Sequence, residues 1–179
     1  GVTPDLACFG KAMANGMPIS AIVGKKEIMA ELDHIFFSMT FGGECLSLAA
    51  SIETIRELAT KDYSHIWKLG DKFRAGMNAA ADSANLKINF AGSSPRHNLT
   101  FSSDYGNPTL MKDVFYQEMV KQKILFSNVL YLNFSHTEED IDKTINAANR
   151  AFDIVNKNLD GLESVLEGKP SISIFRKNT

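Results

Sequence analysis

A long amphipathic helix is encoded towards the carboxy-terminal end of the chain. Apolar residues from Ile141 to Leu159 recur alternately four and three positions apart, which places them on one stripe of a helix. The preceding run from Thr137 to Asp140 has the pattern of a capping box, with acidic residues in the first helical turn. Strands are predicted before this helix, so we expect its stripe to pack on a sheet rather than in a coiled coil.

The rest of the chain alternates between helical and extended patterns. Apolar residues at helical spacing predict three further helices, and short apolar runs next to turn residues predict strands. This alternation favours an α/β or α+β module. The expected helices cover 48–59, 66–84 and 109–119, and the expected strands cover 6–9, 19–23, 88–91, 99–101 and 130–134.

Composition excludes several classes of partner. The formal net charge of -2 and the pI near 6.1 give no electrostatic reason to expect nucleic acid or an anionic membrane as a partner. No apolar stretch is long enough to cross a bilayer. Cys8 and Cys45 have no metal-ligand spacing, and two isolated cysteines fit a reducing cytoplasm better than a disulfide scaffold. We therefore expect a cytoplasmic protein without a metal site.

Lys11 lies between the two apolar segments 6–9 and 19–23, which are expected to be buried strands. Most lysines are solvated, because burial of an ammonium group is costly. The neighbours of Lys11 are glycine, alanine and methionine, which neither solvate nor pair an amine. Desolvation favours the neutral, nucleophilic amine that Schiff-base chemistry requires. Lys11 is therefore the candidate catalytic residue.

The segment from Pro4 to Pro18 resembles the lysine signature of the class III aminotransferases, which use pyridoxal 5'-phosphate (PLP). Members of that family read PDL, then GK, then GG followed by a proline. The resemblance implies that Lys11 forms the internal aldimine with PLP. Asn15 stands where a glycine is common, at a position where asparagine can also adopt the left-handed conformation.

A second segment, from Ser38 to Gly43, resembles the family's T-x-G-G phosphate-contact loop. In the family the threonine hydroxyl and the neighbouring backbone contact the cofactor phosphate, usually from the other subunit of a dimer. The resemblance therefore implies that Thr40, Gly42 and Gly43 bind the cofactor and that the protein is a homodimer. A hydroxyl, a glycine pair and the start of the next helix form a reasonable phosphate cradle. A glycine turn before a helix is the structural alternative.

Two further segments, 119–126 and 135–142, are similar to the glutamate-1-semialdehyde aminomutase subgroup, which has HT-x-EDID before its last long helix. The resemblance implies a fold-type I PLP-dependent transferase of α/β class. Residues 1–45 would form the end of the large PLP-binding domain, and residues 46–179 would form the small domain. The chain begins without an initiator methionine, so we expect it to be the carboxy-terminal part of a longer protein.

The substrate is less well defined than the cofactor. The stretch 129–135 has no arginine to bind a substrate carboxylate, and Asn128 lies where true aminomutases often have an acidic residue. Residues 96–98, Arg-His-Asn, are either a polar cluster that contacts substrate or, as we favour, a solvated loop that enters a strand. Three functions remain open. They are amino-group transfer between an amino donor and a carbonyl acceptor, the glutamate-1-semialdehyde 2,1-aminomutase reaction, and a non-catalytic role in association.

Overall fold

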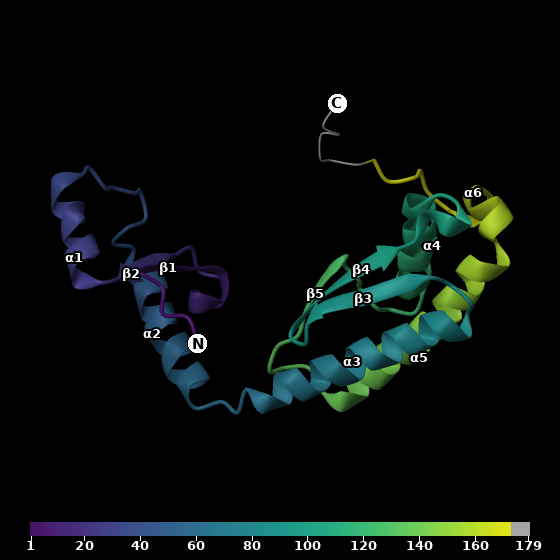
Figure 1. Ribbon diagram of the computed structural model, residues 1–179, viewed down its shortest axis with the longest axis horizontal. Helices are drawn as coiled ribbons and strands as arrows, with labels where there is room; N and C mark the ends of the chain where they lie inside the picture. Colours follow the sequence, from purple (N-terminus) through teal and green to yellow (C-terminus); the bar gives the residue numbers. More distant parts are fainter. Residues whose placement is uncertain (173–179) are drawn as a thin grey trace. The chain divides into compact units, whose positions relative to one another are not determined.

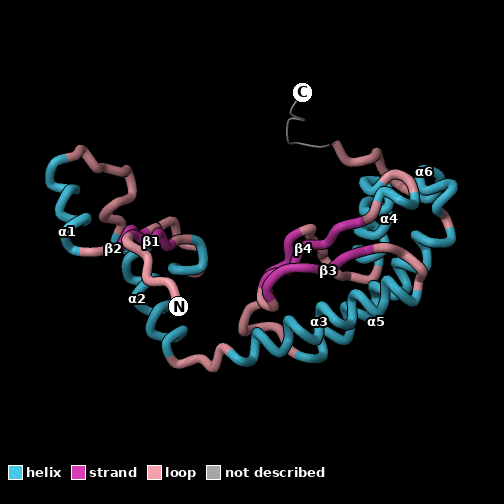
Figure 2. Tube along the Cα trace, viewed as in Figure 1, coloured by secondary structure: helices cyan, strands magenta, loops and turns pink. Residues whose placement is uncertain are grey.

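The computed structural model describes residues 1–172 and divides the chain into two compact units (Figure 1). The first unit runs from Gly1 to Asp62, and the second begins at Tyr63. Each unit has its own sheet and its own helices, which Figure 2 distinguishes by colour. No helix within residues 1–172 is both long enough and apolar enough to cross a membrane.

The first unit is built on a two-stranded antiparallel sheet. Strand β1 (Leu6–Phe9) pairs with β2 (Ala21–Gly24), and the 3-10 helix η1 (Lys11–Ala14) follows β1 in the connection between them. Both strands were expected to be buried, and that expectation is wrong for this chain: Phe9 is 52% exposed and Val23 is 49% exposed. The reason is that no other strand of the described chain pairs with this sheet. The unit continues through α1 (Lys26–Met29), the 3-10 helix η2 (Ala30–His34) and α2 (Cys45–Ala59).

Helix α2 packs on η1, so the short helix that begins with Lys11 lies against the helix that follows the glycine loop. The buried residues of the two elements are small, namely Ala14 on η1 and Ser47 and Ser51 on α2. Small side chains let two helices approach closely. Because of this packing, α2 belongs to the first compact unit, which runs to Asp62. The expected division into the end of a large domain (residues 1–45) and a small domain (residues 46–179) stays a prediction.

The second unit has a three-stranded antiparallel sheet in the order β3-β4-β5. The strands are β3 (Ile88–Ser93), β4 (Arg96–Phe101) and β5 (Val129–Tyr131). Helices α3 and α5 run side by side along the sheet, and α3 contacts both β3 and β4 (Figure 1). The helices of this unit are α3 (Ser64–Ser83), α4 (Pro108–Lys121), α5 (Glu138–Lys157) and α6 (Leu162–Val165), together with the 3-10 helices η3 (Ser103–Tyr105) and η4 (Leu159–Gly161).

Helix α5 confirms the predicted capping box and buried stripe, but the stripe packs mainly against helices α3 and α4 and not on the sheet as expected. The Thr137 hydroxyl accepts a hydrogen bond from the Asp140 amide at 3.2 Å, and the Asp140 carboxylate accepts one from the Thr137 amide at 2.9 Å. The apolar stripe of α5 is buried in the core, where the ring of Phe152 stacks on that of Phe115 at a centroid distance of 4.6 Å. The capping box thus fixes where the helix begins, and the stripe fixes which side packs inward.

Candidate functional site

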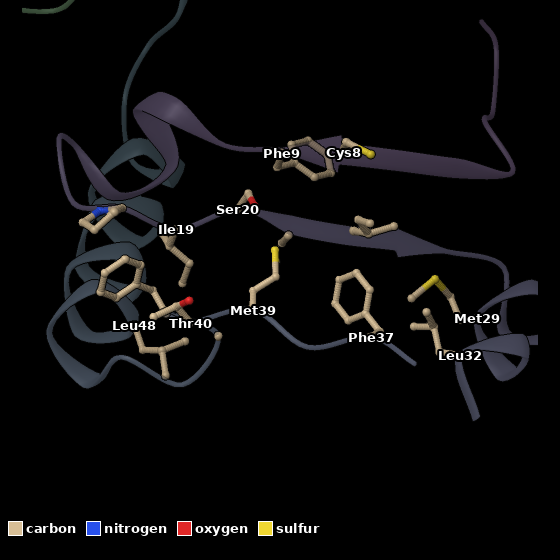
Figure 3. Close-up of a pocket in the computed structure, with 15 residues that line it drawn as sticks. Cys8, Phe9, Ile19, Ser20, Met29, Leu32, Phe37, Met39, Thr40 and Leu48 are labelled. Atoms are coloured by element: carbon tan, nitrogen blue, oxygen red, sulfur yellow. The ribbon is translucent and has the colours of Figure 1, made fainter. Parts of the chain in front are cut away.

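An open cavity of about 860 Å³ lies in the first unit between the two-stranded sheet and the segment that leads into α2 (Figure 3). Cys8, Phe9 and Ser20 line it from the strands and their connection, and Thr40 and Gly42 line it from the glycine loop. Figure 3 shows Phe37, Met39 and Thr40 on one side of the cavity and Phe9, Ile19 and Ser20 on the other. The walls are mainly apolar. Two of the predicted cofactor-binding residues, Thr40 and Gly42, therefore share one cavity.

Lys11 begins η1, directly after Gly10, and its backbone has a φ of 52°. A left-handed conformation costs a residue other than glycine roughly 1–2 kcal/mol, and a lysine side chain gives no local compensation. The side chain of Lys11 is exposed and makes no ion pair within residues 1–172. Our expectation of a desolvated Lys11 is therefore wrong for this chain. Lys11 also does not line the cavity.

Asn15 adopts the left-handed backbone conformation that the sequence suggested it could tolerate. Asn15 has a φ of 47° and ends η1, with its amide donating to the carbonyl of Ala12 at 3.2 Å. Asparagine is one of the few residues other than glycine that adopts this backbone routinely. The replacement of the family's glycine therefore leaves the turn after Lys11 intact.

The glycine loop consists of two overlapping turns. The Gly42 amide donates to the Met39 carbonyl at 3.1 Å, and the Glu44 amide donates to the Phe41 carbonyl at 3.2 Å. The Gly42 amide is therefore already used inside the loop. Within the described residues, the Gly43 amide and the Thr40 hydroxyl have no hydrogen-bond partner. These two groups are the donors that the loop can offer to a phosphate.

Glu44 is the N-cap residue of α2, a role that we did not predict. Its carboxylate accepts hydrogen bonds from the Leu46 amide, the Ser47 amide and the Ser47 hydroxyl, at 2.7, 2.7 and 2.6 Å. These hydrogen bonds lower the pKa of Glu44, and the bond from the Ser47 hydroxyl has the largest effect. The expectation that the helix start takes part in a phosphate cradle is therefore not met, because a carboxylate of the chain already occupies it. Helix caps are most often Ser, Thr, Asp or Asn, so residue preference did not reveal this one.

Residues 96–98 form the start of strand β4 instead of a solvated loop. Our preferred reading of this stretch is therefore wrong for His97, which is fully buried. Arg96 is exposed, and its guanidinium carbon lies 5.8 Å from the centroid of the Tyr131 ring on β5. The strand alternation separates the three residues, so they do not form one polar cluster.

Within the described residues, no group of three or more histidine, cysteine, aspartate or glutamate side chains is arranged to hold a metal ion. Cys8 and Cys45 are both free thiols. The candidate site of the first unit thus combines an exposed amine at Lys11, an unpaired hydroxyl at Thr40, an unpaired amide at Gly43 and an apolar cavity.

Comparison with known proteins relates this geometry to a family. A family model described as Aminotransferase class-III matches residues 1–93. Glutamate-1-semialdehyde 2,1-aminomutase 2 of Staphylococcus saprophyticus is 33% identical over 165 residues, which cover 84% of this chain and 39% of that protein. The 3-aminobutyryl-CoA aminotransferase of Cloacimonas acidaminovorans is also 33% identical over 165 residues, covering 89% of this chain and 40% of that protein.

The fold points to the same class. The Sphingopyxis sp. MTA144 FumI protein, solved in its PLP internal aldimine form, superposes with a TM-score of 0.81 at 27% identity, over 89% of this chain and 39% of its own. The architecture is thus that of part of a fold-type I PLP-dependent transferase. The chain belongs to the class III aminotransferase family, whose cofactor is PLP. It spans about two fifths of the length of the relatives that it matches.

Proposed function

We propose that the whole protein that contains this chain is a PLP-dependent enzyme. It transfers an amino group between a small-molecule amino donor and a carbonyl acceptor, and Lys11 is the residue that carries the cofactor. The observation on which the proposal rests is the backbone at Lys11. A motif lysine is placed in a strained left-handed conformation directly after a strand, with an amine free of ion pairs in the described part of the chain. Residues held in sparsely populated backbone regions cluster at active sites, which supports a functional role for this lysine when it also lies in the family's motif.

The residues present fit part of a PLP site. The Thr40 hydroxyl and the Gly43 amide are unpaired donors within the described residues, which suits them to phosphate oxygens. The Gly42 amide is already bonded to Met39, so we assign to Gly42 the role of allowing the tight turn rather than of donating to the phosphate.

Each residue of the chain has a separate task in this proposal. Lys11 would hold the cofactor through its Nζ amine, and the same amine would act as the base that moves a proton at the substrate carbon. Thr40 and Gly43 would contact the cofactor phosphate, in the family's usual arrangement from the other subunit of the dimer. Bound PLP supplies an electron sink that stabilises negative charge at the substrate carbon. A positioned amine that moves a proton in this way contributes roughly 10²–10⁴ in rate.

We further propose that the protein acts as a homodimer in the cytoplasm. The segment next to the phosphate-contact loop exposes large apolar side chains, with Phe36 94% exposed and Phe41 60% exposed, as a surface that meets a second subunit would. The free thiols of Cys8 and Cys45 agree with a reducing compartment.

One alternative reaction is supported by a specific observation. A relative at 33% identity is a glutamate-1-semialdehyde 2,1-aminomutase, an enzyme whose name describes movement of an amino group within one molecule. The same Lys11 would serve that reaction without a second substrate. Incubation of the whole protein with an amino acid and a keto acid separates the two. Amino-group transfer between separate molecules supports the aminotransferase.

Reduction with borohydride followed by peptide mapping tests the role of Lys11. In the whole protein loaded with PLP, we expect the reduced cofactor on Lys11. Lys11→Arg keeps the positive charge and should abolish both the labelling and turnover. Lys26→Ala, in the short helix α1, is the matched control and should leave both unchanged. Recovery of the label on Lys25, Lys26 or any other lysine would contradict the proposal.

A further inference from the structure

His97 is a fully buried histidine whose ring has no hydrogen-bond partner. Its exposed fraction is 0%, and neither Nδ1 nor Nε2 is bonded to any described group. Most buried polar side chains in folded proteins are hydrogen-bonded, so an unpaired buried ring requires a physical account. The proposed amino-transfer chemistry makes no use of this residue.

The surroundings of His97 are aromatic and aliphatic. Its ring centroid lies 5.9 Å from that of Phe73 on α3 and 6.3 Å from that of Phe90 on β3. It occupies β4, the central strand, where it is in register with Gly92 on one side and Leu130 on the other. A neutral imidazole fits this apolar site, whereas an imidazolium would have no acceptor there for either N–H.

Two charged groups act on His97, and both belong to α3. Burial is the main cause of its lowered pKa, the positive charge of Arg74 adds to that effect, and the negative charge of Asp71 opposes it. Strand β3 has no ionisable side chain, and the only one on β5 is that of Tyr131. Arg74 and Asp71 are also ion-paired to each other at 2.7 Å. Arg74 is itself positive and repels a charged ring, and Asp71, the one anion, is already paired with Arg74.

The same two residues hold the turn of the β3–β4 hairpin against α3. The Ser94 hydroxyl donates to the Asp71 carboxylate at 2.5 Å, and the Arg74 guanidinium donates to the Gly92 carbonyl at 3.1 Å. The backbone of Gly70 lies so close to Ser94 that a Cβ there would be 1.8 Å from the Ser94 carbonyl oxygen. His97 therefore lies on a hairpin that is attached tightly to the helix.

We propose that His97 makes the attachment of the β3–β4 hairpin to α3 sensitive to acid. In its neutral form the ring fills an apolar space beneath the hairpin. Protonation places an unpaired cation in that space, and the cation gains water only when the hairpin moves away from the helix. The second unit therefore opens as the surroundings become acidic.

The direction of the pH effect follows from linkage. The folded state disfavours protonation of His97, whereas an unfolded histidine has a pKa of about 6.5. Above that value both states hold the neutral ring, and His97 has no effect on stability. Below it the unfolded chain binds the proton first, so the folding equilibrium constant falls by up to about tenfold per pH unit until the folded pKa is reached.

Urea unfolding of the 179-residue chain and of the whole protein, followed between pH 5 and pH 8, tests the proposal. We expect the stability of the natural sequence to fall below about pH 6.5. In His97→Leu and in His97→Gln, whose side chains do not titrate, the part of this fall that His97 causes should disappear. His65→Gln, which replaces an exposed histidine of α3, is the matched control and should keep the acid sensitivity. An equal loss of stability in the natural sequence and in His97→Leu would overturn the proposal.

Titration of the histidine ring protons by NMR in the natural chain gives a second test that needs no folded variant. The resonance of His97 should titrate below the ordinary histidine value of about 6.5, and the hairpin amides should lose protection from hydrogen exchange over the same pH interval. A His97 resonance that titrates at or above the ordinary histidine value would overturn the proposal even if both variants failed to fold.

Discussion

Oxygen Oε2 of Glu44 accepts two hydrogen bonds from Ser47, one from its hydroxyl at 2.6 Å and one from its backbone amide at 2.7 Å. Because Ser47 is fully buried where α2 meets η1, this pair fixes the start of α2 next to the helix that carries Lys11. Glu44→Ala should therefore fray the first turn of α2. Glu44→Gln, which keeps one acceptor oxygen, should fray it less. Hydrogen exchange at the amides of Leu46 and Ser47 measures the effect.

The same pair predicts a pH dependence. The hydrogen bonds that Glu44 accepts lower its pKa, so its stabilising effect is fully present above the ordinary value of 4.5 and is lost as the pH falls through the lowered value. Protection of the Leu46 amide should decrease over that acidic interval. Glu44→Gln should show no such decrease, and a pH profile identical to that of the natural chain would show that another carboxylate is responsible.

Thr40 supplies a test of the proposed phosphate site. Its hydroxyl lines the cavity and has no partner within the described residues, so Thr40→Val should leave a phosphate oxygen unpaired and weaken PLP binding by about 1–3 kcal/mol. Thr40→Ser should restore most of the affinity, and Ser38→Ala in the same segment is the control. Absorbance titration of the whole protein with PLP measures all three variants. Unchanged affinity in the valine variant would give Thr40 a structural role only.

Gly70 supplies a test of the packing between α3 and the hairpin. An alanine inside a helix is normally about 1 kcal/mol more favourable than a glycine. Here the added Cβ would lie 1.8 Å from the Ser94 carbonyl oxygen, a backbone atom that cannot rotate away. Overpacking costs about 1–3 kcal/mol or more, so Gly70→Ala should be destabilising in urea unfolding. Gly168→Ala, where a Cβ meets nothing within 4 Å, should have little effect.

The elements that the sequence predicted well are those with a strong local signal. The capping box at Thr137 and the apolar stripe behind it placed α5 to within two residues at its far end, because both signals lie on the helix itself. The strand 88–91 was correctly identified, but β3 extends to Ser93, since its pairing with β4 continues to the hairpin turn. Pairing partners lie elsewhere in the chain, so a local pattern does not show where a strand ends.

The site was predictable only in part. The residue types revealed the motif around Lys11, and they showed that Asn15 could adopt a left-handed backbone conformation. The use of the Gly42 amide inside its own loop and the capping by Glu44 depend on the three-dimensional path of residues 39–47, which residue types alone do not show. The burial of His97 was missed because a polar triplet resembles a solvated loop until its strand is paired on both sides.

The last prediction concerns the 179-residue chain by itself. Its two-stranded sheet leaves Leu6, Phe9 and Val23 about half exposed, at 48%, 52% and 49%, and Lys11 is open to water. A cofactor ring bound there would be solvated on one side, so we expect the chain alone to bind PLP weakly and to have no transaminase activity. Exposed strands with apolar side chains also favour pairing with other copies, so the chain should self-associate through its first unit.

Gel filtration of the chain after mixing with PLP and an amino donor tests this prediction. We expect little cofactor absorbance to remain with the protein, together with an elution volume that shifts with concentration. Phe9→Lys, which places a charge on strand β1, should reduce the association, whereas Ile172→Lys, at a residue 90% exposed outside the sheet, should not. A stoichiometric cofactor band that survives gel filtration, or measurable transamination, would show that residues 1–179 already contain a complete site.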